Sequence, residues 1–289
     1  MENIPIIIHF FRPTPKGRID YRELLEYFQA LPNFDIYTNQ NEVDIVYNDN
    51  DFGFEYEFKI TKVSQVKAIY KLDPGYLNIN FMLCLPILIP VFAAKEIINF
   101  TQKVAKAFDL SIYHESFEDV RAFTVADLYG LFVSSQQAYL EEYGPGDKIF
   151  YDTNSLSEIC KYQRTIDNLY ECLHGDEQVN PCTPIIDRAN DEYGIRTDWD
   201  FGIATVFAPH FDFVLIKDEE GEKFMIRRND FLRIMDKYLS KTDAYLPDLY
   251  YIKPKQAKAC KGVLGKLRKF MIVDRNFEEI RIVDLLDKK

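Results

Sequence analysis

Residues 41–60 have the sequence NEVDIVYNDNDFGFEYEFKI, which carries the clearest structural signal in the chain. Apolar side chains alternate with charged ones in its second half, at Phe54, Tyr56, Phe58 and Ile60. Successive side chains of a strand point to opposite faces, so this alternation predicts a strand with one buried face. Residues 48–51 are Asn-Asp-Asn-Asp, which favours a turn. The stretch is therefore predicted to form a β-hairpin.

The segments on either side of this hairpin complete an α+β pattern. Before it, residues 4–11 are typical of a strand, and residues 20–31 have helical spacing with Asp20 as a plausible N-cap. After it, the pattern predicts strands at 76–85 and 112–114 and helices at 91–108 and 124–143. This order predicts a mixed or antiparallel sheet with helices packed on one face, as in split βαβ folds.

Gly144-Pro145-Gly146 is the strongest break in the pattern and predicts a boundary between an α+β domain at 1–144 and a smaller α+β domain at 147–289. In the second domain we expect residues 174–190 to form a loop. The elements expected there are helices at 155–173, 229–238 and 254–270, strands at 199–207, 211–216, 223–226 and 249–252, and a short element at 280–286.

Charge is distributed unevenly along the 289 residues, whose formal net charge is −11. Residues 1–144 carry a balance of −8, and residues 145–289 carry −3. An acidic surface repels phosphate and anionic lipid, so nucleic acid and membrane are not expected as partners. Aromatic residues make up 15% of the chain and supply the side-chain types that anchor protein interfaces. Another protein is the expected partner.

The cysteines do not form the pattern of a disulfide-bonded secreted domain. Their number is odd, they are widely spaced, and no leader segment is visible, which together favour a reducing cytoplasm. Cys160, Cys172, His174 and Cys182 are residue types that bind zinc. Their spacing matches no familiar zinc motif, so we expect no metal and no cofactor.

Two further groups suggest a hydrolase or nuclease. Asp44 or Asp51, followed by Glu57 and Lys59, resembles in type the acidic and Glu-x-Lys residues that hold Mg²⁺ in restriction-type nucleases. The simpler interpretation is that these charges form the solvated face of a strand.

His210 and Asp212, two residues apart, fall on one face of a strand and could share a proton or a ligand. His114 and Glu115 form another histidine–carboxylate pair. The chain has no nucleophile elbow, phosphate-binding loop, zincin motif or dinucleotide fingerprint, which lowers the expectation of an enzyme.

The sharpest local charge contrast is a predicted basic helix near 254–270. Its candidate binding residues are Lys258, Lys261, Lys266, Arg268 and Lys269. These side chains either meet an acidic partner or balance the acidic N-terminal domain.

The sequence thus predicts a non-enzymatic cytoplasmic protein-binding module of bacterial type, comparable in its properties with inhibitors, immunity proteins or adaptors. The alternative is a metal-dependent hydrolase or nuclease that uses His210 and Asp212, or Asp44, Glu57 and Lys59.

Overall fold

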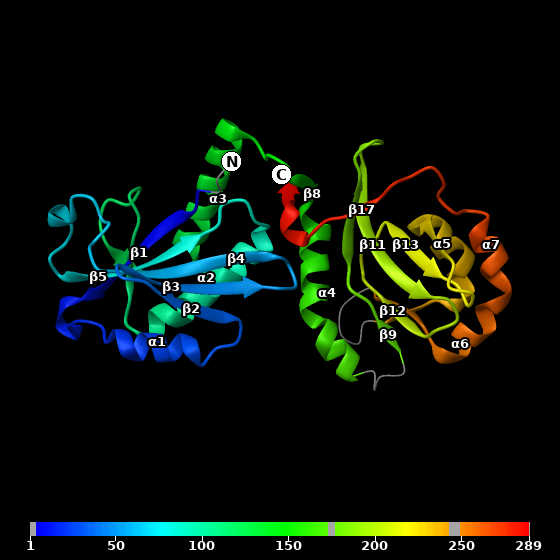
Figure 1. Cartoon of the computed structure of the whole chain (residues 1–289), viewed down its shortest axis with the longest axis horizontal. Coiled ribbons are helices and arrows are strands. Elements are labelled where there is room, and N and C mark those ends of the chain that lie inside the picture. Colours follow the sequence, from blue (N-terminus) through cyan, green and yellow to red (C-terminus); the bar gives the residue numbers. More distant parts are fainter. Residues whose placement is uncertain (1–3, 173–176, 243–248, 289) are drawn as a thin grey trace. The chain divides into compact units, whose positions relative to one another are not determined.

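The computed structural model describes residues 4–172, 177–242 and 249–288, without the side chains of Cys172 and Thr242. The chain divides into unit 1 (Met1–Phe150 with Val283–Leu286) and unit 2 (Tyr151–Ile282 with Asp287–Lys289). Sheets and helices occur in both units, so the predicted α+β class is confirmed (Figure 1).

Unit 1 is built on a seven-stranded sheet of order β2-β3-β4-β5-β1-β6-β7, in which all neighbouring strands are antiparallel. Its strands are β1 (Ile6–Pro13), β2 (Phe34–Thr38), β3 (Glu42–Asp49), β4 (Phe54–Thr61), β5 (Tyr76–Leu85), β6 (Ser111–Tyr113) and β7 (Arg121–Ala122). Its helices are α1 (Tyr21–Gln29), α2 (Val91–Ala107) and α3 (Val125–Tyr143), with short 3-10 turns at Thr14–Lys16 and Ile69–Lys71.

The hairpin of β3 and β4 forms as predicted, with Ile45 opposite Phe58. The four apolar side chains of the alternating half are buried. Phe58 contacts Phe28 of α1 and Phe100 of α2, with ring centroids 5.1 and 6.1 Å away, so both helices cover the same face of the sheet. Asp20 caps α1 as expected, because its carboxylate accepts a hydrogen bond from the Arg22 backbone N–H at 2.8 Å.

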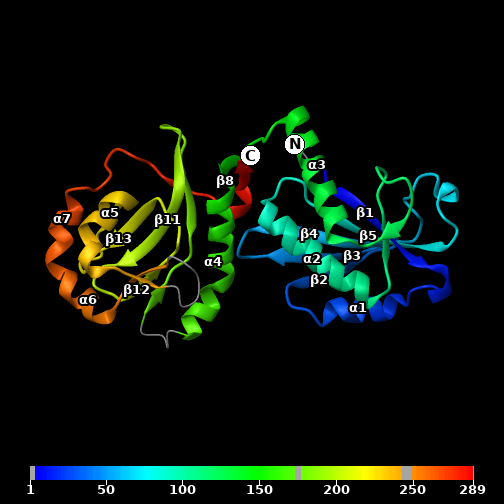
Figure 2. The ribbon, with the colours of Figure 1, turned by 180° about the vertical axis from the view of Figure 1, so that it is seen from behind.

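Helix α3 packs beside α2, as both views show (Figures 1 and 2). Thr124 caps its start by accepting the Asp127 backbone N–H. Gln136, which is buried, donates from Nε2 to the carbonyl oxygens of Ile87 and Ile89 at 2.9 and 3.0 Å. These bonds fix the position of α3 against the segment that joins β5 to α2.

Unit 2 contains a five-stranded sheet of order β14-β13-β11-β10-β17 and a four-stranded sheet of order β15-β16-β12-β9. The strand pairs β11–β13 and β9–β12 are parallel. The first sheet comprises β10 (Thr183–Asp187), β11 (Glu192–Asp200), β13 (Phe213–Lys217), β14 (Lys223–Arg227) and β17 (Glu278–Glu279). The second comprises β9 (Gln178–Val179), β12 (Thr205–Phe207), β15 (Ser240–Thr242) and β16 (Leu249–Ile252). Trp199 is fully buried against Phe201, Phe207 and Phe231.

The helices of unit 2 are α4 (Thr153–Cys172), α5 (Arg228–Met235), α6 (Pro254–Ala259) and α7 (Leu264–Arg268), with 3-10 turns at Asp236–Tyr238 and Cys260–Val263. A further 3-10 turn, Ile282–Asp284, begins at the last residue before the segment Val283–Leu286 of unit 1. Strands β8 (Ile149–Asp152) and β18 (Leu285–Lys288) form a separate two-stranded sheet.

Three predictions for this part of the chain were wrong in detail. The expected helix at 254–270 is divided into α6, a 3-10 turn and α7, because Gly262 and Gly265 weaken helix propensity there. The expected strand at 199–207 is interrupted after Asp200 by a turn in which Gly202 has φ +87°. Strand β10 lies within the expected loop at 174–190, where Pro184 made a strand improbable.

Candidate binding site

Unit 1 contains an open pocket of about 680 Å³, a size typical of ligand sites. Its lining comes from β1 with the two residues before it, the loop after β4, the segment between β5 and α2, the end of β6 with the residues that follow it, and α3. Apolar side chains in the lining include Ile7, Val66, Ile87 and Ala138.

Three tyrosines line this pocket. Tyr113 is the last residue of β6, and Tyr139 and Tyr143 lie one turn apart on α3. The rings of Tyr139 and Tyr143 are 5.0 Å apart between centroids, and Tyr113 lies 6.5 Å from the ring of His9. Tyrosine side chains from two separate elements therefore line the pocket.

The charged side chains in the lining are Glu115, Glu142 and Lys67. All three residues are exposed. Glu142 accepts a hydrogen bond from Tyr143, and this contact raises the pKa of the Tyr143 hydroxyl above its ordinary value. The two carboxylates outweigh the single ammonium, in keeping with the acidic balance of residues 1–144.

Two histidines also line the pocket. His9 pairs with Tyr113 across β1 and β6, and His114 follows Tyr113 directly. The Nδ1 atom of His114 accepts the Ser116 backbone N–H at 3.1 Å. Burial lowers the pKa of both rings, and for His9 the neighbouring His114 lowers it further, against a smaller opposing effect of Glu115 on each. Both imidazoles are therefore neutral at pH 7.

The structure brings together Asp44, Glu57 and Lys59, which the sequence offered as a nuclease-like group. The Lys59 ammonium lies 3.3 Å from Asp44 Oδ1 and 3.2 Å from Glu57 Oε1. Burial lowers the pKa of Lys59, but the two carboxylates outweigh it and leave that pKa raised. The expectation of a simply solvated face was wrong, because only 26% of the Lys59 side chain is exposed. The Lys59 ammonium thus occupies the space between the two carboxylates that a metal ion would need.

Asp51, the alternative acidic residue, lies in the turn between β3 and β4, apart from that ion pair. Within the described ranges, no group of three or more His, Cys, Asp and Glu side chains is arranged to hold a metal ion.

His210 and Asp212 are also brought together, through a residue that the sequence did not indicate. The Tyr151 hydroxyl donates to Asp212 Oδ2 at 2.7 Å and lies 2.9 Å from His210 Nε2. Asp212 Oδ2 also accepts the Ile195 backbone N–H at 2.8 Å. Burial, followed by the Asp212 carboxylate, raises the pKa of Tyr151. The cluster is a hydrogen-bonded Tyr–His–Asp arrangement with a partly exposed histidine.

Cys160 and Cys182, two of the zinc-type residues, are buried cysteines outside any disulfide bond. Burial raises the pKa of Cys182, which keeps it protonated. The Cys172 side chain and His174 lie outside the described residues, so the prediction about that group stays a prediction.

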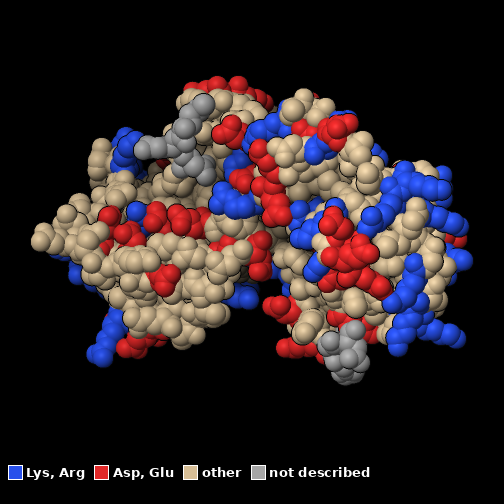
Figure 3. Space-filling model, turned by 45° about the vertical axis from the view of Figure 1, so that its right-hand side comes forward, with Lys and Arg blue, Asp and Glu red and all other residues tan. Residues whose placement is uncertain are grey.

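The five candidate basic residues lie on α6, α7 and the residues beside them, and all are exposed. Lys261 pairs with Glu219 and Arg268 pairs with Asp218, so both cations contact the turn between β13 and β14 of their own unit. Figure 3 shows Lys and Arg side chains gathered on this side of unit 2 beside a group of acidic ones. For Lys258, Lys266 and Lys269, a binding role stays a prediction.

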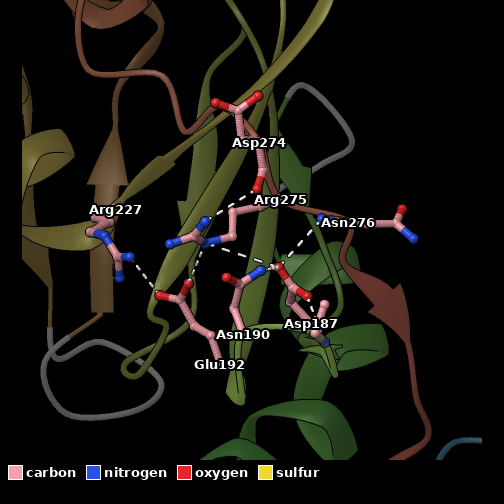
Figure 4. A network of polar contacts seen from close by, with 8 residues as sticks. Asp187, Asn190, Glu192, Arg227, Asp274, Arg275 and Asn276 are labelled. Atoms are coloured by element: carbon pink, nitrogen blue, oxygen red, sulfur yellow. Dashed lines mark hydrogen bonds and ion pairs between the residues drawn. The ribbon is translucent and has the colours of Figure 1, made fainter.

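A polar network that the sequence did not indicate joins the hairpin of β10 and β11 to residues 274–276 (Figure 4). Arg275 Nε lies 3.2 Å from Glu192 Oε2 and 4.0 Å from Asp187 Oδ2. Arg227 pairs with the other oxygen of Glu192. Burial raises the pKa of Asp187, but hydrogen bonds from Asn190, from the Asn276 backbone and from other backbone N–H groups outweigh it and leave that pKa lowered. These contacts hold residues 274–276 against the five-stranded sheet of unit 2.

No helix in the described part of the chain is long and apolar enough to cross a bilayer. Comparison with known proteins gave no match to a family model, to a curated protein or to a solved structure. The pocket of unit 1 is therefore interpreted from its own chemistry.

Proposed function

We propose that this chain is a non-enzymatic cytoplasmic protein-binding module, of the inhibitor, immunity-protein or adaptor kind, which holds a segment of its partner in the pocket of unit 1. The proposal rests on one observation: the open pocket of about 680 Å³ is lined by both tyrosine and glutamate side chains. Tyrosine is enriched where protein interfaces gain most of their affinity, since its ring buries a large area while its hydroxyl stays hydrated.

The acidic balance of residues 1–144 supports a protein partner over a nucleic acid, because phosphates are repelled by that charge. The polar residues that the sequence suggested for catalysis form hydrogen bonds or ion pairs within the chain, which supports structural roles for them. Lys59 neutralises Asp44 and Glu57, and Asp212 is held by Tyr151 and Ile195.

A hydrolase that uses His210 and Asp212 remains the alternative, favoured by the 2.9 Å contact between Tyr151 and the imidazole. Screening the protein against ester and phosphodiester substrates, with Asp212→Asn as the control, tests this alternative. Turnover that the variant loses would replace the binding proposal.

The binding proposal is tested by selecting peptides from a random display library on the full chain and on Ala138→Trp, in which the indole fills the pocket. Ala138 is exposed on α3, so the larger side chain does not disturb the core. We expect peptides that bind the wild type and fail on the variant. If every enriched peptide binds both proteins equally, the pocket is not the binding site.

A further inference from the structure

The pocket combines two features that share one kind of ligand. The first is the set of three tyrosine rings, from β6 and α3. The second is the pair of carboxylates, Glu115 and Glu142, in the same lining. Tyrosine faces attract cations through the ring quadrupole, and carboxylates attract them through charge.

We infer that the pocket recognises an organic cation, presented as a lysine or arginine side chain of the bound segment. This inference rests on the proposed protein-binding function and names the chemistry of what the pocket accepts. The aliphatic stem of such a side chain contacts the apolar lining at Ile7, Val66 and Ala138, while its charged end lies among the rings and carboxylates.

The lining also contains one ammonium, Lys67, and two imidazoles, His9 and His114. Lys67 opposes a cation, but it is one exposed ammonium against two carboxylates. His9 and His114 oppose a cation only when protonated, and both are neutral at pH 7. The balance at neutral pH therefore favours a positive ligand over an acidic one.

A metal ion fits the same lining less well. Divalent cations need several carboxylate or imidazole ligands converging on one point, and the described residues contain no such group of three. Tyrosine faces, which bind organic cations, contribute little to a hydrated metal ion.

The inference is tested on the full chain by NMR titration with four matched capped peptides that carry lysine, arginine, acetyl-lysine or glutamate at the central position. We expect lysine or arginine to bind at least about fivefold more tightly than acetyl-lysine, since acetylation removes the charge and keeps the stem. Equal affinities for lysine and acetyl-lysine would overturn the inference. Tetramethylammonium serves as a fifth probe, for a free cation: tighter binding of tetramethylammonium than of either basic peptide would assign the site to a small molecule.

One pair of variants at Tyr139 separates the ring from its hydroxyl, and a single variant at Glu115 removes a charge while keeping the shape of the side chain. Tyr139→Phe keeps the ring face and should change affinity for the basic peptides less than about threefold, whereas Tyr139→Leu should weaken it by about fivefold or more. Glu115→Gln should weaken the same peptides and leave acetyl-lysine unchanged. Tyr37→Leu, an exposed tyrosine of β2 outside the pocket, is the matched control and should change nothing. Equal losses in Tyr139→Phe and Tyr139→Leu would exclude a role for the ring face.

These experiments distinguish failure of the cation inference from failure of the protein-binding proposal. If the display selection yields pocket-dependent peptides that lack basic residues, protein binding stands and the cation assignment fails. If the basic capped peptides bind but no selected peptide depends on the pocket, the cation site stands and the protein-binding proposal fails.

Discussion

Lys59 shows how one side chain changes the interpretation of a strand. Alternation placed it on a polar face, yet its ammonium bridges Asp44 and Glu57 in a half-buried setting. We expect Lys59→Ala to cost about 1 kcal/mol, because two partly buried carboxylates lose their shared cation. Urea unfolding measures the free energy.

Glu55→Ala is the matched control on the same polar face. Glu55 is exposed, so its removal should cost less than about 0.5 kcal/mol. Phe58→Ala, on the buried face, should cost about 3 kcal/mol or more. If Lys59→Ala costs no more than Glu55→Ala, the ion pair contributes nothing to folding.

The close neighbours of Gly194 leave no space for a side chain at this position. A Cβ atom at this position would lie 2.8 Å from both Asp212 Oδ2 and Phe213 Cε2. Gly194→Ala must therefore displace the carboxylate that binds Tyr151, and it should destabilise the protein by more than about 1 kcal/mol. Thermal unfolding followed by circular dichroism measures the change.

Gly130→Ala provides the comparison. Gly130 lies within α3, and a Cβ atom there meets nothing within 4 Å. Because alanine favours helix over glycine, this variant should be stabilised by about 0.5–1 kcal/mol. A Gly194→Ala variant as stable as the wild type would show that the contact at Gly194 is relaxed without cost.

At the scale of elements, the basic segment of unit 2 divides into cations with different roles. Arg268 pairs with Asp218, whose side chain is only 2% exposed, whereas Lys266 is exposed. Arg268→Glu places a second negative charge beside a buried carboxylate and should lower the melting temperature by several degrees. Lys266→Glu should leave it unchanged. Identical melting temperatures for the two variants would contradict a structural role for Arg268.

The elements that could be predicted are those whose signal is local. The hairpin, α1 and α3 carry their alternation, their helical spacing and their caps within the element itself. The single basic helix predicted at 254–270 was wrong, because a 3-10 turn that contains Gly262 separates α6 from α7. Strand β10 was missed because Pro184 disfavours a strand and because one of its two sheet neighbours, β17, is distant in sequence, although β11 follows it directly.

The pocket could not be predicted, since its lining joins residues of β1, β6 and α3 that are far apart in sequence. Tyr151 is likewise 59 residues from His210, and only the fold brings them within hydrogen-bonding distance. The group at Asp44, Glu57 and Lys59 could be predicted, because strand periodicity and hairpin pairing place these residues on one face. The expectation that His210 and Asp212 share a strand face was wrong, because both precede β13 and the Tyr151 hydroxyl joins them.

The whole molecule should respond to acid in two separate pH windows, one for each unit. In unit 1, the pKa values of His9 and His114 are lowered from 6.5, so protonation favours the unfolded chain. Their contribution to stability is complete above pH 6.5 and is lost as the pH falls from there through the lowered pKa values. In unit 2, the pKa values of Asp187 and Asp218 are lowered from 3.8. The stabilisation that these two aspartates contribute is complete above pH 3.8 and is lost only as the pH falls below 3.8.

Trp199 makes the two windows measurable, because it is the single tryptophan and is buried in unit 2. Its fluorescence reports the unfolding of unit 2, while calorimetry reports both units. Between about pH 7.5 and pH 5, the calorimetric transition of unit 1 should move to lower temperature while the Trp199 transition stays in place. The double variant His9→Gln, His114→Gln should lose the shift of unit 1 in this range, and Asp187→Asn should weaken the later shift of unit 2. A Trp199 transition that falls together with unit 1 above pH 5 would show that the two units unfold as one.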